Sequence, residues 1–127
     1  MLRGYETIRA DYDGLNDKLI DLTPLVMRYI KNSSHARPVK SYKIEEHFEI
    51  KGPAVRCIVH YLRKSEHPIG SDSRGYYYCK SEEELEVTID HMRQREGSIR
   101  EARIGLEHAF SGLSGNSSVQ LSLGGIL

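Results

Sequence analysis

The stretch from Val39 to Cys79 constrains the fold of this chain more than any other part of the sequence. Its pattern predicts a short helix, a tight turn, a second helix and then a small β-hairpin. Lys51-Gly52-Pro53 separates the two helices, because glycine permits a turn and proline suits the first position of a new helix. In the first helix, Ser41 is expected to be the N-cap, and Ile44 and Phe48 lie four residues apart on one face.

The second helix, expected over residues 53–64, has two different faces. An apolar stripe with helical spacing, predicted to be buried, consists of Val55, Ile58, Val59 and Leu62. The opposite face, called here the polar face, carries cations, as a helix that enters a DNA groove requires. The polar face consists of Ala54, Arg56, Cys57, His60, Arg63 and Lys64. Together with Lys51, which precedes the helix, we expect these residues to contact DNA.

A β-hairpin is expected over residues 68–79, with Asp72-Ser73-Arg74-Gly75 as its turn. Arg74 at the tip is expected to contact a phosphate or the minor groove, and Gly75 to adopt a backbone angle open mainly to glycine. Three consecutive tyrosines follow, and in a strand Tyr77 faces the side opposite to its two neighbours. One side is expected to pack on the core; a base-stacking role for Tyr77 is the alternative.

The segment LRKSEHPIGSDSRGYYYCKSEEELE, residues 62–86, resembles the pattern "LR…PI.S…GY…s.eEL" of bacterial and bacteriophage winged-helix proteins. The biotin-repressor type of DNA-binding domain carries a similar hairpin. Further elements, M-x-x-R from Met92 and S-I-x-x-A-x-x-G-L from Ser98, are similar to small phage-encoded winged-helix proteins. The resemblance spans residues 24–110 and implies a winged helix-turn-helix and a DNA-binding role. The first helix of the pair departs from the family, since it has IEEHFEI where an "LA…LG" pattern is usual.

The net charge of zero hides an uneven distribution along the chain. Residues 24–80 contain eleven Lys and Arg against five Asp and Glu, a net charge of +6. Residues 1–23 carry a net charge of −2 and residues 81–110 one of −4. A basic module with acidic flanks is typical of a protein that binds phosphate backbones, although segment charges of this size also arise by chance.

The segments before and after this basic module have separate expected structures. Residues 1–22 are expected to be an arm. Thr23-Pro24 is expected to cap a helix with its core face at Leu25, Val26, Tyr29 and Ile30, so that a winged helix-turn-helix occupies residues 23–80. Ser81 to Glu84 is a capping box that opens a long C-terminal helix over residues 81–110. Residues 111–127, which are rich in Gly and Ser, are expected to form a flexible tail.

The long helix carries an apolar stripe suited to dimerisation, because twofold symmetry gives a small DNA-binding protein both affinity and register. The stripe consists of Leu85, Ile89, Met92, Ile99, Leu106 and Phe110. The alternative is a helix that folds back on its own core. Gly97, near the middle, would then mark a kink or a break.

Catalytic chemistry is not expected. Cys57 and His60 share a helix face, but no carboxylate stands at a spacing that would orient a nucleophile pair. The same residues with His67 and Cys79 fit no common zinc spacing, so neither a metal nor another cofactor is expected. Two cysteines, without a secretory leader or a membrane-spanning apolar run, predict a cytoplasmic protein.

The sequence therefore predicts a mostly α protein with a small β-hairpin, a winged helix-turn-helix followed by a long C-terminal helix. The expected partners are double-stranded DNA and a second copy of the chain. The expected role is that of a phage or mobile-element transcriptional regulator or replication accessory. The alternative is a winged-helix interaction module that binds or inhibits a host protein.

Overall fold

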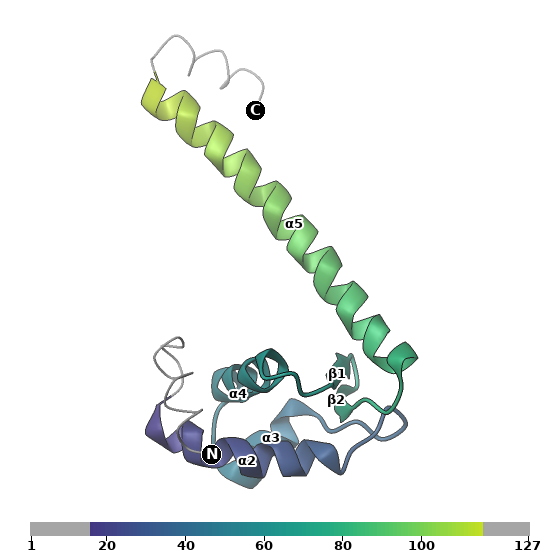
Figure 1. Ribbon diagram of the computed structural model, residues 1–127. Helices are drawn as coiled ribbons and strands as arrows, with labels where there is room; N and C mark the ends of the chain where they lie inside the picture. Colours follow the sequence, from purple (N-terminus) through teal and green to yellow (C-terminus); the bar gives the residue numbers. More distant parts are fainter. Residues whose placement is uncertain (1–15, 116–127) are drawn as a thin grey trace. The chain divides into compact units, whose positions relative to one another are not determined.

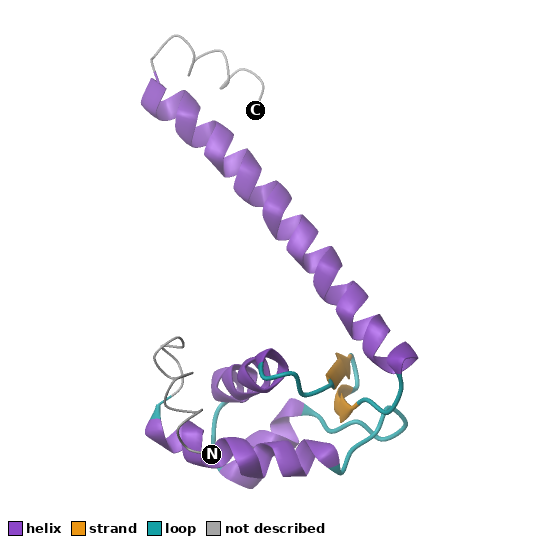
Figure 2. Ribbon diagram, viewed as in Figure 1, coloured by secondary structure: helices purple, strands orange, loops and turns teal. Residues whose placement is uncertain are grey.

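The computed structural model describes residues 16–115 and contains four helices and one hairpin in that range (Figures 1 and 2). It divides into two compact units, one ending at Thr88 and the other beginning at Ile89. The predicted class, mostly α with a small hairpin and a long C-terminal helix, is confirmed. The elements are α2 (Asp17–Lys31), α3 (Ser41–Phe48), α4 (Gly52–Lys64), β1 (Ile69–Asp72), β2 (Gly75–Tyr78) and α5 (Glu82–Gly115).

Helix α2 begins at Asp17, so the start predicted at Thr23-Pro24 is wrong. Its N-cap is Asn16, whose Oδ1 accepts a hydrogen bond from the Leu19 N–H at 3.0 Å. Proline inside a helix costs about 3 kcal/mol, but burying the Leu19 and Ile20 side chains returns roughly 1.5–3 kcal/mol each. The helix therefore continues through Pro24, and residues 17–22 of the expected arm belong to it.

The face that α2 turns toward α3, α4 and β2 is only partly the predicted one. Val26 and Ile30 are fully buried, and Tyr29 packs partly buried against the core. Leu25 is 43% exposed, so its assignment to the core is wrong. The actual stripe extends back through Thr23 to Leu19, which keeps a spacing of three or four residues along one face.

The connection from α3 to α4 differs from the predicted glycine turn. Glu49 adopts the left-handed conformation, with φ 54° and ψ 50°, whereas Gly52 is already the first residue of α4. Lys40 rather than Ser41 is the N-cap of α3, and the Ser41 hydroxyl donates a hydrogen bond to Glu45 Oε2 at 2.9 Å. The predicted pair in α3 is confirmed, since Ile44 is fully buried and Phe48 packs against the core.

The hairpin is antiparallel, and Asp72 pairs with Gly75 across a tip formed by Ser73 and Arg74. A third stretch joins it through a single bridge. The Val39 N–H donates to the Tyr76 carbonyl at 2.7 Å, and the Tyr76 N–H donates to the Val39 carbonyl at 2.8 Å. The bridge joins the loop between α2 and α3 to β2, which therefore lies between β1 and Val39.

Helix α5 runs without interruption from Glu82 to Gly115, beyond the predicted end at residue 110. Half of the predicted capping box is confirmed, since Ser81 Oγ accepts from the Glu84 N–H at 3.2 Å. The reciprocal bond is displaced by one residue, because Glu84 Oε1 accepts from the Lys80 N–H at 2.9 Å and not from the N–H of Ser81. Because α5 is one helix through Gly97, the alternative of a break there, with residues 98–110 folding back as a separate helix, is wrong. The expected tail falls in α5 up to Gly115 and otherwise outside the described residues.

We expect Gly97→Ala to stabilise α5 by about 0.5–1 kcal/mol, because alanine loses less backbone entropy in a helix than glycine. A Cβ at Gly97 would meet no atom within 4 Å, so the substitution adds no clash. Thermal unfolding followed by circular dichroism measures the change. Gln94→Gly, at an exposed position of α5, makes the opposite change and should lower the stability. Equal stability of the two variants would contradict the prediction.

Candidate nucleic-acid interface

Helix α4 places its apolar stripe inside the first unit and exposes part of its polar face. Val55 and Ile58 are fully buried and Val59 and Leu62 are 2% exposed, so the predicted stripe is confirmed. Tyr61, at 5% exposure, joins it. No Asp or Glu occurs between Gly52 and Lys64, so this helix presents side-chain cations and no carboxylate of its own.

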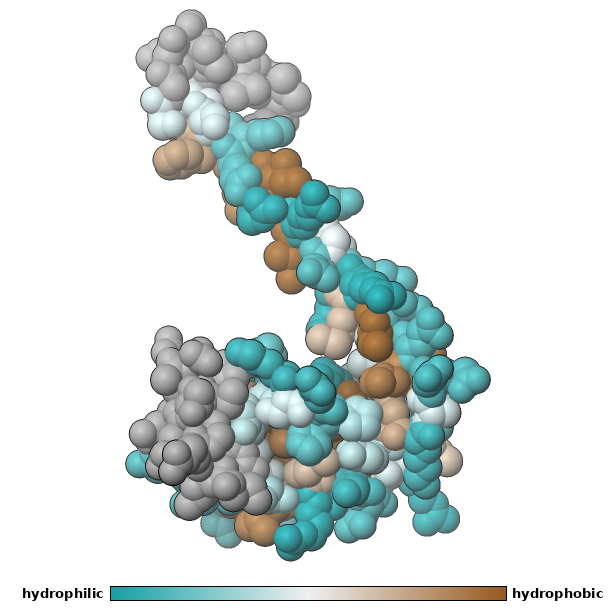
Figure 3. All heavy atoms as spheres, viewed as in Figure 1, coloured by the Kyte–Doolittle hydropathy of each residue, from teal (hydrophilic) through white to brown (hydrophobic). Residues whose placement is uncertain are grey.

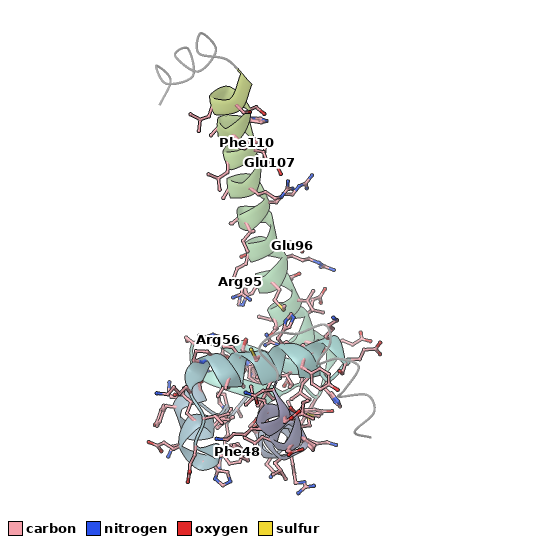
Figure 4. All side chains as sticks on the ribbon, turned by 90° about the vertical axis from the view of Figure 1, so that its left-hand side faces the viewer. Phe48, Arg56, Arg95, Glu96, Glu107 and Phe110 are labelled. Carbon is pink, nitrogen blue, oxygen red and sulfur yellow. The ribbon has the colours of Figure 1, made fainter. Side chains whose placement is uncertain are left out.

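The residues expected to contact DNA fall into two groups in the structure. Arg56, His60 and Lys64 are exposed along α4, with Lys51 exposed just before it and Arg74 exposed at the hairpin tip. Ala54, Cys57 and Arg63 are half-buried, and Ala54 packs against the core. Figure 4 shows Arg56 at the outer side of α4, away from Phe48 of α3. The accessible part of the predicted face is therefore centred on Arg56, His60 and Lys64.

Arg63 is engaged with the hairpin. Its Nε donates to the Ile69 carbonyl at 2.9 Å, and its Nη2 donates to Ser71 Oγ at 3.0 Å. Ser71 is held from a second side as well, since its backbone N–H donates to Oγ1 of the buried Thr88 at 3.1 Å. Arg63 thus fixes β1 against the end of α4, a role that its position on the basic side of the helix did not predict.

Removing the Arg63 guanidinium should loosen the hairpin. We expect Arg63→Met to lower the free energy of unfolding by about 1–3 kcal/mol, because the hydrogen bonds of a charged donor are lost while the aliphatic stem is kept. Arg56→Met is the matched control on the same helix and should leave stability nearly unchanged. Urea unfolding decides the matter: equal midpoints for the two variants would assign Arg63 no structural role.

Arg74 at the tip is paired within the hairpin. Its Nη2 lies 2.8 Å from Asp72 Oδ2 and donates to the His35 carbonyl at 2.9 Å. The Arg74 side-chain hydrogen bond holds the pKa of Asp72 below its ordinary value, and the same pair raises the pKa of Arg74. A carboxyl with a depressed pKa keeps its partner until the pH falls below the ordinary carboxyl range, so the pair is intact at neutral pH. Such an exposed pair is weak and can exchange for another anion.

The three tyrosines alternate as expected for a strand. Tyr77 is 1% exposed and lies edge-on to the His35 ring, with centroids 5.1 Å apart. The base-stacking alternative for Tyr77 is therefore wrong, because its ring is inside. Tyr76 and Tyr78 are half-buried, and Lys31 Nζ lies 5.6 Å from the centroid of the Tyr78 ring.

An open cleft of about 540 Å³ lies between the start of α3 and the hairpin tip. It contains two cations, Lys40 and Arg74, and two carboxylates, Glu45 and Asp72. Lys40 was missed by the sequence reasoning, since nothing in the pattern shows that the α3 start lies beside the tip. The mixed charge makes the cleft a flank of the polar face rather than a strong anion site. Its other lining residues are Ser41, Tyr42, Ser71, Ser73, Gly75 and Tyr76.

The cysteines are both unpaired thiols, with Cys57 half-buried and Cys79 buried. Burial raises the pKa of the Cys79 thiol, and the Glu84 carboxylate adds to the shift. Within residues 16–115, no three His, Cys, Asp or Glu side chains gather closely enough to hold a metal ion. None of the helices in that range is both long and apolar enough to cross a membrane.

Comparison with protein-family models gave no match to this chain. Searches of curated proteins and of solved structures likewise found no similar protein. The case for function therefore depends on the residues and geometry described above.

Proposed function

We propose that this chain binds double-stranded DNA through a winged helix-turn-helix made of α2, α3, α4 and the hairpin. The observation that carries the proposal is the exposed face of α4, which presents Arg56, His60 and Lys64 and contains no carboxylate. The element order supports it, because two helices joined by a short turn are followed by a hairpin that Val39 extends by one bridge. The net charge of +6 over residues 24–80 adds an attraction for phosphate.

In this proposal α4 enters the major groove. Arg56 stands in the first half of the helix, the part of a recognition helix that contacts base edges, and its guanidinium can bridge N7 and O6 of a guanine. Lys64 at the far end and Lys51 before the helix supply phosphate contacts. The hairpin follows the flanking backbone, and Arg63 keeps it at a fixed position relative to α4.

A protein-interaction module remains the second candidate. Three cations in the predicted interface, Arg56, Arg63 and Arg74, would favour DNA over a protein partner, since a protein adaptor has no need of cations along one surface. Two of the three have intramolecular partners: Arg63 bonds to the hairpin and Arg74 to Asp72. The electrostatic case for DNA therefore depends on fewer accessible cations than the sequence indicated.

Binding of a random-sequence duplex across a salt series tests the proposal. We expect measurable affinity with a log–log slope that reflects displaced counterions, followed by enrichment of a common site when binders are selected from a random pool. Absence of duplex binding at low salt, together with tight capture of a host protein, would replace the DNA proposal with the adaptor. A phage regulatory or replication role is part of the proposal, supported by the resemblance of residues 62–86.

Arg74 should contribute to affinity without reading sequence. We expect Arg74→Ala to weaken binding to all duplexes alike and to reduce the salt slope by about one, because one phosphate contact is lost. Asp72→Asn is the matched control: it frees the Arg74 guanidinium while its amide oxygen can still accept the Arg74 N–H, so binding should tighten. If both variants leave the salt slope unchanged, Arg74 does not contact phosphate.

A further inference from the structure

Helix α5 carries an apolar row that is half-buried at Leu85 and exposed from Met92 onward. One apolar residue recurs every seven positions, a spacing that predicts a left-handed supercoil of two helices. Ile99, Leu106 and Leu113 are 69%, 71% and 64% exposed. Figure 3 shows brown patches between hydrophilic residues along α5. The row, called here the seam, consists of Leu85, Met92, Ile99, Leu106 and Leu113.

Two further rows flank the seam and limit how a second helix can lie on it. Three positions after each seam residue stand Thr88, Arg95, Ala102 and Ala109. Four positions after each seam residue stand Ile89, Glu96, Arg103 and Phe110. The first row is small toward its C-terminal end. The second is apolar at both ends and carries opposite charges in the middle, so it is complementary to itself when reversed.

We propose that two copies of the chain pair through α5 in antiparallel orientation, with Glu96 of each copy facing Arg103 of the other. In this register Ile99 packs on Ala102 of the second copy, and Met92 packs on Ala109. Ile89 meets Phe110 at each end. The proposal concerns self-association and does not depend on the DNA-binding proposal.

The parallel alternative is disfavoured by like charges. Parallel pairing sets each residue against the same residue of the second copy. The two Arg95 guanidinium groups would then meet between the helices, next to the seam. Antiparallel pairing instead places the aliphatic stem of Arg95 against Leu106 of the second copy and leaves its charge at the edge. Ile99 and Met92 then face the small residues Ala102 and Ala109, which allows the two helices to pack closely at these layers.

The charges also select one antiparallel register. Sliding one helix by seven residues in one direction sets Glu96 against Glu96 of the second copy. Sliding it by seven in the other direction sets Arg103 against Arg103. Within its own helix Arg103 pairs with Glu107 at 2.6 Å, but both side chains are more than half exposed. An exposed pair of this kind is weak, so Arg103 can contact Glu96 of the second copy in its place or in addition to it.

Charge exchange tests the register by sedimentation equilibrium on the full chain. We expect the wild-type chain to be a dimer, and Glu96→Arg or Arg103→Glu alone to raise the dissociation constant at least about tenfold, since each places two like-charge pairs in the dimer. The double variant E96R/R103E should restore the wild-type constant to within about threefold, because opposite charges again face each other. A double variant no better than either single one would overturn the register.

Cysteine cross-linking tests the orientation. In a Cys57→Ser background, where the remaining Cys79 is only 7% exposed, we expect Met92→Cys together with Ala109→Cys to form a disulfide between positions 92 and 109. These positions lie about 25 Å apart on one helix, so the link can form only between two copies. Peptide mapping that finds links between two positions 92 would overturn the antiparallel orientation, and a wild-type chain that stays monomeric at its highest soluble concentration would overturn the pairing itself.

Duplex titrations of the same variants keep the two proposals separate. E96R and R103E lie outside the module of residues 24–80, so weak binding to random duplex should persist when the dimer is lost. Failure of DNA binding in a chain that still dimerises would leave the pairing of α5 intact.

Discussion

Gly75→Val is expected to lower the free energy of unfolding by about 3–5 kcal/mol and to disrupt the hairpin, because strain and lost hydrogen bonds act together. Gly75 has a φ of +137°, a conformation that residues with a side chain rarely adopt. A Cβ at this position would also overlap the Val39 carbonyl oxygen and come within 2.6 Å of the carbonyl carbon. Relief of that clash requires Val39 to move and breaks its two hydrogen bonds with Tyr76.

Ser73→Val is the matched control, since it adds the same kind of side chain at the exposed tip, two residues away, where φ is not positive. Urea unfolding of both variants, with cross-strand nuclear Overhauser effects between Gly70 and Tyr77 as a probe of the hairpin, gives the comparison. A Gly75→Val midpoint equal to that of Ser73→Val would show that the close approach of Val39 is not required. Gly75→Ala should fall between the two, because its Cβ meets the same carbonyl without the added bulk.

Arg56→Ala is expected to weaken binding to a selected DNA site by about 1–3 kcal/mol and to relax the preference at one base pair. Binding to random duplex should fall much less, because the lost contact is to a base rather than to a phosphate. The residue is exposed on α4, so folding should be unaffected. Titrations of selected and random duplexes at the same salt concentration measure the two effects.

Arg56→Lys separates charge from geometry, since lysine keeps the positive charge but lacks the planar fork that contacts two acceptors of guanine. We expect Arg56→Lys to retain affinity for random duplex and to lose specificity nearly as far as alanine does. Equal losses on selected and random DNA would reassign Arg56 to a phosphate contact. No loss on either would show that α4 is not the recognition helix.

The sequence determined those elements in which local preference and burial agree. Ile58 and Leu62 repeat with helical spacing and are buried as that spacing requires. The Ser81 hydroxyl caps α5 through the Glu84 N–H because that hydrogen bond is local. The positive φ of Gly75 was also predictable, since this glycine follows turn residues between two β-prone segments. In each case the deciding interactions lie within a few residues of chain.

Tertiary packing alone decided the features in which a local preference is overruled or a distant partner is needed. Pro24 lies inside α2 because the core gains more from Leu19 and Ile20 than the helix loses at proline. The continuity of α5 at Gly97 has a local cause instead: a single glycine costs only about 1 kcal/mol in a helix that continues on both sides, and no atom lies within 4 Å of a Cβ built there.

The same distinction applies to the candidate site. The sequence located its basic residues, since spacing places them opposite the buried stripe of α4. It could not divide them by role, because Arg63 acquires its partners from a strand that folds back onto α4, and Arg74 acquires one from the loop that contains His35. The charges were determined by the sequence; which of them remain accessible was determined by the neighbours that the fold brings to each.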